Sequence, residues 1–419
     1  MVNPVRRNNM RLHIRSVLFV VSLCLFAIIA PNVIAQDSTP PVRAITTGPN
    51  FHWFGYYDKY QFDPNDRYVL GMKVDFEHRL PTERDAIKIG MIDIANDNKW
   101  IELGESRAWS WQQGCMLQWR PGSDREVVWN DREGDRFVCR VLDVKTRKVR
   151  TLPRAIGSIS PDGKLALCED FSRIWNFRAG YAYAGIPDPY AEEPAPAEIG
   201  VWRMDMDTGK TRLLVSIADL AKIPYPGQMP GHRHYVNHLS WNPDGTRFLM
   251  FNRWEGKGQP TRVFTMAADG SDLRLLSSRG ASHWTWRDPE HVLIWASGAY
   301  RLYKDDGSGE PKEELWRHRN GHQTYVPGTK NEWLLTDTYP KGKKREQVVY
   351  LYHIPTRRKV ELGRFHSPRD YKGQWRCDTH PRLSRDGTKV VIDSPHGGNG
   401  RQMYMIDMSG IIKTETKTP

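Results

Sequence analysis

The stretch "NHLSWNPDGTRFLMFNRW", residues 237–254, contains the local pattern that decides the fold. An apolar run leads into Asn242-Pro243-Asp244-Gly245, which has the composition of a tight turn, and a second apolar run follows at once. This pattern predicts two short antiparallel strands joined by a tight turn. Six further units align with it on the turn. The seven units begin at Lys59, Met116, Ile156, His238, His283, His322 and His380.

Two more strands are predicted after almost every unit. A third apolar stretch follows each pair, for example "TRVFTMAA" at 261–268, and six units then add a fourth, such as "DLRLLS" at 272–277. The last unit has only a poor fourth strand, and "VRAITTG" at 42–48 is suited to fill that place. We therefore expect an all-β, seven-bladed β-propeller with four antiparallel strands per blade, its ring closed by the N-terminal strand. A six-bladed ring and a two-domain β protein are the alternatives.

Residues 1–35 have the features of a secretory signal peptide. Four arginines precede an apolar run at 17–30, and Val33-Ile34-Ala35 provides a cleavage site after Ala35. The apolar run is short for a membrane span, and no second one follows it. We expect residues 36–419 to form a single propeller domain that is secreted or periplasmic, monomeric and free of membrane spans after cleavage. An uncleaved N-terminal anchor is the alternative.

The composition excludes several classes of protein and indicates one class of partner. With 39% hydrophobic, 26% charged and 11% aromatic residues, the chain is not a disordered tail, a collagen or a coiled coil. Its formal net charge is +12, yet it has no block of lysine and arginine and no nucleic-acid motif. We therefore expect an anionic polysaccharide or oligosaccharide as partner, and no nucleic acid. A solvated basic surface without such a partner is the alternative.

Two long connections interrupt the regular repeat. A stretch rich in proline, glycine and tyrosine at about 171–200 lengthens the third unit, and "KIPYPGQMPGHRHY" at 222–235 leads into the fourth. We expect the first to be a long loop inserted in blade three. Long loops on a rigid scaffold often carry function, so this insertion is a candidate part of the site.

Histidine occupies the first position of the unit in four consecutive blades. His238, His283, His322 and His380 share this register, and Lys59 holds it in the first blade. Because the first strand of each blade lines the central channel of a propeller, these side chains are predicted to face one axial space. Neutral imidazole is a common metal ligand and a general base. The alternative is that each histidine only hydrogen-bonds to the neighbouring blade.

Polar neighbours extend the predicted site. Gln323 follows His322, and Asp378 precedes His380 by two residues, so these side chains are candidate ligands of one divalent ion: manganese, zinc or calcium. No tight spacing such as HExxH supports the ion. The candidate substrate-binding residues in the same register or at the ends of second strands are Lys59, His283, Asn130 and Arg132. For Asn130 and Arg132, turn capping is the alternative.

Several segments resemble secreted propeller proteins of the oligogalacturonate-lyase type and the propeller ulvan lyases. They are "HWFGYYDK" at 52–59, "WSWQQGCMLQW" at 109–119, "RAGYAYAGIPDP" at 178–189, "NHLSW" at 237–241, "SHWTWRDPEH" at 282–291 and "HPRLSRDGTKVVIDSPH" at 380–396. The resemblance spans nearly all of residues 36–419. A further segment, "FTMAADGSDLRLLSS" at 264–278, resembles the repeats of the propeller domain of the translocation protein TolB.

The lyase resemblance implies cleavage of a uronate-containing polysaccharide by β-elimination. In this chemistry a cation neutralises the uronate carboxylate, a base removes the C5 proton and an acid protonates the O4 leaving group. The resemblance implies His238 as the base, Tyr181 or Tyr183 as the acid, and Arg178 at the carboxylate. It also implies a divalent ion held by the histidines and the glutamine named above.

The chain departs from these families at one place. It has no histidine between 79 and 231, and Gln112, Gln113 and Asn130 stand in the region where ulvan lyases use histidines of early blades. Gln113 is therefore a candidate substrate-binding residue. The TolB resemblance implies the alternative function, a non-catalytic binding or scaffold propeller in the periplasm. A glycoside hydrolase is a third alternative, and it would require a facing pair of carboxylates.

Overall fold

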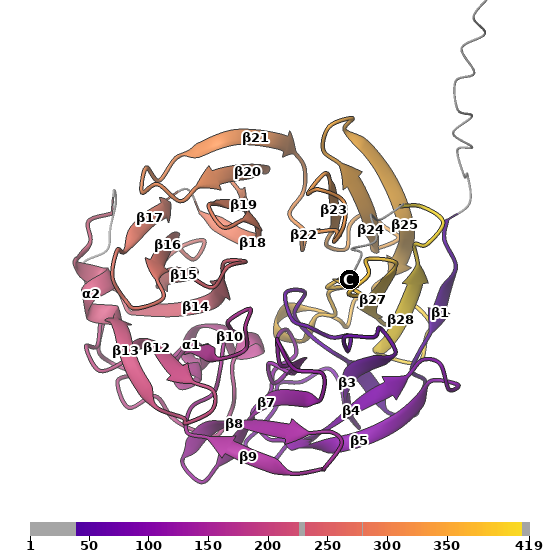
Figure 1. Ribbon diagram of the computed structural model, residues 1–419, viewed down its shortest axis with the longest axis horizontal. Helices are drawn as coiled ribbons and strands as arrows, with labels where there is room; N and C mark the ends of the chain where they lie inside the picture. The colour runs from indigo at the N-terminus through magenta and orange to yellow at the C-terminus, as the bar shows by residue number, and fades with distance from the viewer. Residues whose placement is uncertain (1–38, 226–230, 279, 413–419) are drawn as a thin grey trace, which may run out of the picture. The chain divides into compact units, whose positions relative to one another are not determined.

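The computed structural model describes residues 39–225, 231–278 and 280–412, which belong to the compact unit Thr39–Pro419. The predicted signal peptide lies outside the described residues. Seven four-stranded antiparallel sheets follow one another around a central axis (Figure 1). The first strands of the blades lie near this axis, and the later strands run outward (Figure 1). The predicted seven-bladed all-β propeller is therefore confirmed.

The first four blades account for residues 51–277. Blade one contains β2 (Phe51–Trp53), β3 (Tyr68–Val74), β4 (Ile87–Asp93) and β5 (Lys99–Ser106). Blade two contains β6 (Gln118–Trp119), β7 (Glu126–Glu133), β8 (Arg136–Asp143) and β9 (Val149–Leu152). Blade three contains β10 (Ser158–Ile159), β11 (Leu165–Cys168), β12 (Gly200–Asp205) and β13 (Thr211–Ser216). Blade four contains β14 (His234–Trp241), β15 (Arg247–Trp254), β16 (Thr261–Ala267) and β17 (Arg274–Ser277).

The last three blades complete the ring. Blade five contains β18 (Ala281–Asp288), β19 (His291–Ala296), β20 (Ala299–Lys304) and β21 (Pro311–Arg317). Blade six contains β22 (Thr324–Tyr325), β23 (Trp333–Thr336), β24 (Glu346–His353) and β25 (Arg358–His366). Blade seven contains β26 (Arg382–Leu383), β27 (Lys389–Ser394), β28 (Gln402–Asp407) and the N-terminal strand β1 (Val42–Ala44). A single 3-10 turn, Gly373–Trp375, precedes this blade.

The turn between β14 and β15 shows why the repeat folds as predicted. The Asn242 side chain accepts a hydrogen bond from the Arg247 amide at 3.0 Å, and the Gly245 amide donates to the Asn242 carbonyl at 3.1 Å. Gly245 has φ +72°, a conformation that favours glycine. The turn residues of the motif therefore satisfy their own polar groups and set the register of the hairpin.

The N-terminal strand closes the ring, as predicted. β1 pairs antiparallel with β28, with Val42 opposite Ile406 and Ala44 opposite Tyr404. Blade seven thus takes its outer strand from the beginning of the described chain and its other three from the end. Pairing across the closure leaves β28 no open edge.

The insertion in blade three is present between β11 and β12, but it begins with a helix that the prediction of a long loop missed. α1 covers Phe171–Arg178, and a 3-10 turn, Ala179–Tyr181, follows it. Phe171 and Ile174 are one helical turn apart and both join the buried core. Arg173 is also buried, because its guanidinium donates to the His234 and Glu193 carbonyls and pairs with Asp188. These contacts order the insertion and fix its far end near the axis.

A second short helix, α2 (Ile217–Lys222), follows β13. It begins at a capping box in which the Ser216 hydroxyl accepts from the Asp219 amide. Among the described residues, no helix is both long enough and apolar enough to cross a membrane.

Candidate active site and metal centre

Four histidines from four consecutive blades gather beside Tyr56 and Tyr57. His322 lies between His283 and His380, with ring-centroid distances of 4.1 and 4.3 Å. Tyr56 stacks on His238 and also lies 5.3 Å from His380, ring centroid to ring centroid. All four imidazoles are buried. The structure thus brings the histidines of one register into one cluster.

A backbone distortion recurs at this position of the repeat. His238, His380 and the equivalent Met116 have φ of +58°, +38° and +55°, in a region that non-glycine residues rarely adopt. In blade four the ladder between β14 and β15 shifts register between Asn237 and Ser240, on either side of the histidine. Distortions of this kind collect at functional sites, where the surrounding structure holds them in place.

The hydrogen bonds of His238 define which ring nitrogen carries the lone pair. Arg178 Nη1 lies 3.4 Å from His238 Nε2, and Gln113 Nε2 lies 3.4 Å from Nδ1. A guanidinium only donates, so Nε2 carries the lone pair and the proton sits on Nδ1. The side-chain amide of Gln113 lies on the Nδ1 side of the ring, where its oxygen can accept a hydrogen bond from that proton. Burial, together with Arg253 and Arg178, holds the pKa of His238 well below its ordinary value, and the ring is neutral.

A cavity of about 330 Å³ opens beside this histidine. Its polar lining comes from the β2–β3 connection, the insertion, strands β14, β15 and β18, the β15–β16 and β23–β24 connections, and the segments that precede β22 and β26. The lining includes Tyr56, Arg178, Tyr181, His238, Arg253, Gln259, Ser282, His283, Asn320, Tyr339 and Arg376. Within this cavity, His283 Nδ1 lies 2.8 Å from Asn320 Oδ1, so the amide of Asn320 orients that ring.

Three arginines face the cavity, and two of them have no carboxylate partner. Arg376 pairs with Asp378 at 2.7 Å. In the part of the chain that the structure describes, neither Arg178 nor Arg253 forms an ion pair, and Arg253 Nε has no hydrogen-bond partner although Arg253 is only 6% exposed. Burial and the charge of Arg178 lower the pKa of Arg253 to about 10. Unpaired buried cations are costly, so this arrangement is suited to receive an anion.

Tyr181 ends the insertion and contacts two of these arginines. Its hydroxyl accepts a hydrogen bond from Arg376 Nη2, and its ring lies 3.7 Å from the Arg178 guanidinium. Burial raises the pKa of a phenol, but the charges of Arg376 and Arg178 outweigh burial and lower the pKa of Tyr181. Its ring centroid is 5.8 Å from that of His238. A proton donor of increased acidity therefore lies beside a neutral base.

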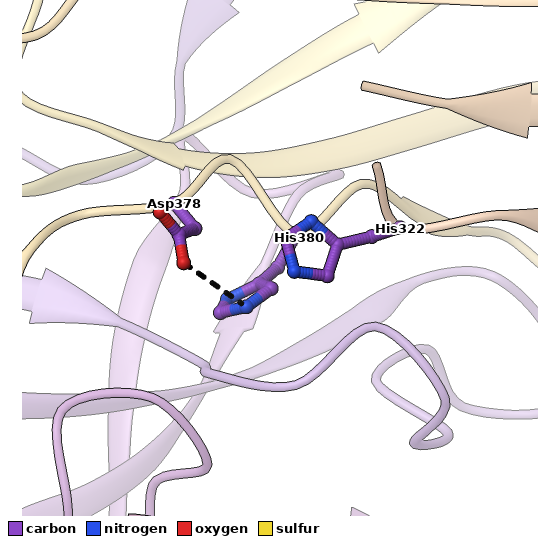
Figure 2. Close-up of side chains that lie close together, drawn as sticks. All are labelled: His322, Asp378 and His380. Atoms are coloured by element: carbon purple, nitrogen blue, oxygen red, sulfur yellow. Dashed lines mark ion pairs between the residues drawn. The ribbon is translucent and has the colours of Figure 1, made fainter. Parts of the chain in front are cut away.

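His322, Asp378 and His380 form a candidate metal centre beside Tyr56. One ligand atom of each lies within 4.8 Å of the others (Figure 2). His322 Nδ1 is 2.9 Å from Asp337 Oδ1, which leaves Nε2 as the atom with the lone pair. A carboxylate that orients an imidazole in this way is typical of metal sites. The Asp337 carboxyl is kept ionised: burial would raise its pKa, but His322 and Thr379 lower it.

The donor atoms of this cluster fit a divalent cation. His322 Nε2, His380 Nε2 and Asp378 Oδ1 are buried and have no hydrogen-bond partner among the described residues. Buried polar atoms without partners are rare, and one cation would satisfy all three. The other Asp378 oxygen accepts from Arg376 Nε at 2.7 Å. Arg376 thus joins the cluster to the cavity that contains Tyr181.

Other predicted site residues lie outside the cavity. The Tyr183 hydroxyl accepts from Asn130 Nδ2 at 2.9 Å, and the Asn130 side chain also bonds the Ile156 amide and carbonyl, so both serve packing between blades two and three. Arg132 donates to the Glu83 carbonyl. Lys59 pairs with Asp58 at 2.8 Å.

Gln323 and Gln113 also lie outside the positions predicted for them. The Gln323 amide nitrogen donates to the His283 carbonyl at 2.8 Å, so it connects blades five and six, and Gln323 is not one of the three clustered donors. Gln113 does not line the cavity but lies behind His238, where it holds the ring.

Sequence reasoning missed several residues that the structure brings to the site. Tyr56 and Tyr339 line the cavity, and Arg253 and Arg376 supply two of its three guanidinium groups. A signal existed for two of them: Tyr56 lies in the quoted segment 52–59, and Arg253 lies at the end of the second strand of its unit. Tyr339 and Arg376 lie in connections between strands, where the repeat makes no prediction.

The sequence matches no protein-family model and no curated protein. Among solved structures, it is similar to an oligogalacturonate lyase in complex with manganese, with a TM-score of 0.65, 12% identity and coverage of 88% of this chain and 94% of that chain. An oligogalacturonate lyase from Vibrio parahaemolyticus has a TM-score of 0.62 at 11% identity, covering 89% of this chain and 94% of that chain.

A puromycin-hydrolyzing peptidase from Mycobacterium tuberculosis has a TM-score of 0.52 at 17% identity, covering 88% of this chain and 55% of that chain. Proteins of different activity thus share this architecture, and at these identities the likeness shows the fold. The chain is a seven-bladed propeller whose structural neighbours include oligogalacturonate lyases.

Proposed function

We propose that the protein is a metal-assisted lyase that cleaves a uronate-containing anionic glycan by β-elimination. One observation carries the proposal. A neutral histidine with its lone pair on Nε2, two arginines without carboxylate partners and a tyrosine of lowered pKa surround one cavity. These are the base, the anion site and the acid that the elimination requires.

The first requirement of the elimination is a site that binds and neutralises the uronate carboxylate. A uronate carboxylate in the cavity would lie against Arg178 and Arg253, which lack any other acidic partner among the described residues. Neutralising the carboxylate makes the proton on C5 more acidic, because the negative charge that develops next to it is stabilised. Arg253 is buried and Arg178 is partly buried, so both need little reorganisation when the substrate binds.

The elimination then transfers two protons, one to the base and one from the acid. His238 Nε2 takes the C5 proton, and the electron pair of the C5–H bond becomes the C4–C5 double bond. The C4–O4 bond breaks, and the Tyr181 hydroxyl gives its proton to O4. The products are an oligosaccharide with an unsaturated uronate at its new non-reducing end and a second piece whose new reducing end carries the former O4 as its anomeric hydroxyl. Gln113 holds the His238 ring in the tautomer that this step needs.

His322, Asp378 and His380 would hold the divalent ion, which supplies Lewis-acid stabilisation of negative charge on the substrate. Two imidazoles and one carboxylate suit manganese or zinc better than calcium, which takes oxygen ligands. A structural neighbour is described as a complex with manganese. Asp337 orients His322, and Arg376 connects Asp378 to the Tyr181 hydroxyl.

The basic charge of the chain and its N-terminal sequence support an anionic glycan outside the cytoplasm. The chain has 61 lysines and arginines against 49 acidic residues, a balance that attracts polyanions. Residues 1–35 have the composition of a secretory signal peptide, so the protein is proposed to act in the periplasm or in the medium.

The test is an ultraviolet scan of the purified protein with pectate oligomers, ulvan, alginate and glycosaminoglycans, each with and without EDTA. The conjugated double bond of the product absorbs, and the substrate does not. A rise that EDTA abolishes and manganese restores supports the proposal in full. An increase in absorbance that EDTA does not change supports the lyase activity and contradicts a role for the metal ion. No rise from a folded protein on any of these glycans contradicts the lyase and favours a binding propeller.

A further inference from the structure

A second cavity, of about 400 Å³, lies against blade six and is lined mainly by cations. Arg319, Lys341, Lys359 and Arg364 face it, and Glu346 is its one carboxylate. We refer to this cavity as the blade-six pocket. Its walls come from the segment before β22, the β23–β24 connection, and strands β24 and β25.

The blade-six pocket shares two walls with the candidate active site. Arg319 lines the blade-six pocket, and the next residue, Asn320, lines the active-site cavity. In the same way, Thr338 lines the blade-six pocket and Tyr339 lines the active-site cavity. The two cavities therefore border the same two backbone segments.

The cations of the blade-six pocket are only partly balanced within the described residues. Arg364 pairs with Glu361 at 2.6 Å and with Glu346 at 3.7 Å. Lys341 and Arg319 have no ion pair in the described part of the chain, and the Lys359 ammonium lies 3.8 Å from the Tyr350 ring. Lys343, Lys344 and Arg345 follow Lys341, so this connection is locally basic, contrary to the expectation that the chain has no block of lysine and arginine.

The pKa of Lys359 reflects the charges around it. Partial burial lowers this pKa, the nearby Glu361 raises it, and the charges of Arg364 and Arg319 lower it further. Cations held this close repel one another, and an anion between them removes that repulsion. The four cations are exposed, so they would attract an acidic group that enters the pocket, and salt would screen this attraction.

We propose that the blade-six pocket is a second anion subsite, which binds an acidic group on a neighbouring sugar while a uronate occupies the active-site cavity. This inference rests on the proposed function, and it defines the substrate class more narrowly. The substrate carries carboxylate or sulfate groups on successive sugars, so a polyanionic oligosaccharide binds more tightly than a single uronate or a disaccharide.

The test compares ligand lengths by isothermal titration calorimetry. The double variant Lys341→Gln with Lys359→Gln removes two charges of the pocket and none from the active-site cavity. We expect binding of tetragalacturonate to weaken about tenfold and binding of digalacturonate to stay within twofold of wild type. Lys164→Gln, an exposed lysine on the β10–β11 turn, is the matched control and should change neither. The tenfold difference should shrink at high ionic strength, where exposed charges are screened.

A heparin-derived tetrasaccharide supplies the sulfate arm of the same experiment. If the double variant binds either tetrasaccharide more weakly than the wild type does, the result supports the subsite. The tetrasaccharide that loses more affinity shows whether the subsite prefers carboxylate or sulfate. Equal weakening of the short and long ligands, or no weakening of either tetrasaccharide, overturns it. Binding requires no turnover, so the two proposals can fail separately. If the protein cleaves no glycan but shows this length dependence, the subsite is supported and the lyase activity is contradicted.

Discussion

Tyr56 stacks on His238 with ring centroids 5.3 Å apart and ring planes within 3° of parallel. The same tyrosine ring lies 5.3 Å from the ring of His380, on the metal side of the cluster. Tyr56 belongs to the connection between β2 and β3 in blade one, whereas the two histidines belong to blades four and seven. One buried side chain thus sets the distance between the proposed base and the proposed metal centre, and it can do so only when the ring of blades is closed.

His238→Gln should reduce kcat/KM for elimination by about a thousandfold, within the range typical for loss of a general base. The amide retains hydrogen bonding to Gln113 and Arg178 but cannot accept the C5 proton. The measurement is the initial rate of ultraviolet absorbance increase, with circular dichroism to show that the fold is retained. His353→Gln, at the far end of β24, is the matched control and should keep the wild-type rate. A variant at His238 that remains fully active would remove this residue from the base role.

The two tyrosines of the insertion should separate activity from stability. Tyr181→Phe removes a hydroxyl that faces the cavity and should lower kcat by about a hundredfold or more. Tyr183→Phe removes a hydroxyl bonded to Asn130 and should cost about 1 kcal/mol of stability with kcat unchanged. Rates and urea unfolding of both variants are the measurements. The opposite result, with kcat lost in the Tyr183 variant alone, would exchange their roles.

The fold could be predicted because each blade repeats its turn chemistry. The unit at 237–254 becomes β14 and β15, and the stretches quoted as third and fourth strands become β16 and β17. The helix α1 was missed, although Asp170 precedes it and Phe171 and Ile174 have helical spacing. Its short length and the many Pro and Gly residues after it obscured that signal.

The sequence predicts those site residues that occupy equivalent positions in the repeated units. His238 and His380 hold equivalent positions, and the structure brings them together with the other two histidines. Arg376 instead reaches the cavity from a connection before β26, and its contact with Tyr181 joins segments 195 residues apart. No periodicity of the sequence specifies a contact of that kind, because it depends on the closed ring and on the path of the insertion.

Two buried arginines on neighbouring strands should respond to substitution in opposite ways. Arg253 faces the cavity with no ion pair, so Arg253→Met should raise stability by about 1–3 kcal/mol and raise KM at least tenfold. Arg262 donates to Asn252 and to the Leu220 and Ile223 carbonyls, so Arg262→Met should lower stability by about 3 kcal/mol. Urea unfolding and Michaelis–Menten kinetics test both. A destabilised Arg253→Met protein with unchanged KM would show a structural arginine.

Manganese binding should depend on the cluster of Figure 2. His380→Gln leaves the Asp378–Arg376 pair intact and should weaken Mn²⁺ binding at least tenfold, and Asp378→Asn should do the same. Asp386→Asn, in the β26–β27 turn, is the control for loss of one carboxylate. Calorimetric titration with MnCl₂ and the shift of Tm with added metal are the measurements. Binding of Mn²⁺ by His380→Gln at wild-type strength would place the ion elsewhere.

Stability should fall in mild acid because of a histidine at the ring closure. His52 Nδ1 lies 3.0 Å from Gln402 Oε1, which connects β2 to β28, and the Gln402 amide nitrogen donates to the Asn50 carbonyl. The glutamine oxygen therefore only accepts, and Nδ1 carries the proton. Burial lowers the pKa of His52 to about 4, whereas its unfolded value is 6.5. Between these values the unfolded chain binds more protons, so the free energy of unfolding decreases as pH falls through 6.5 toward 4.

The size of this effect at pH 5 is about 2 kcal/mol, calculated from the two pKa values by proton linkage. His52→Gln retains a donor to Gln402 and removes the titrating group. Other buried histidines also contribute to acid sensitivity, so the informative quantity is the difference between wild type and variant. Urea unfolding at pH 7 and pH 5 should show the variant losing about 2 kcal/mol less than wild type over this interval. Equal losses in the two proteins would mean that the His52 ring takes up a proton without weakening the contact that closes the propeller.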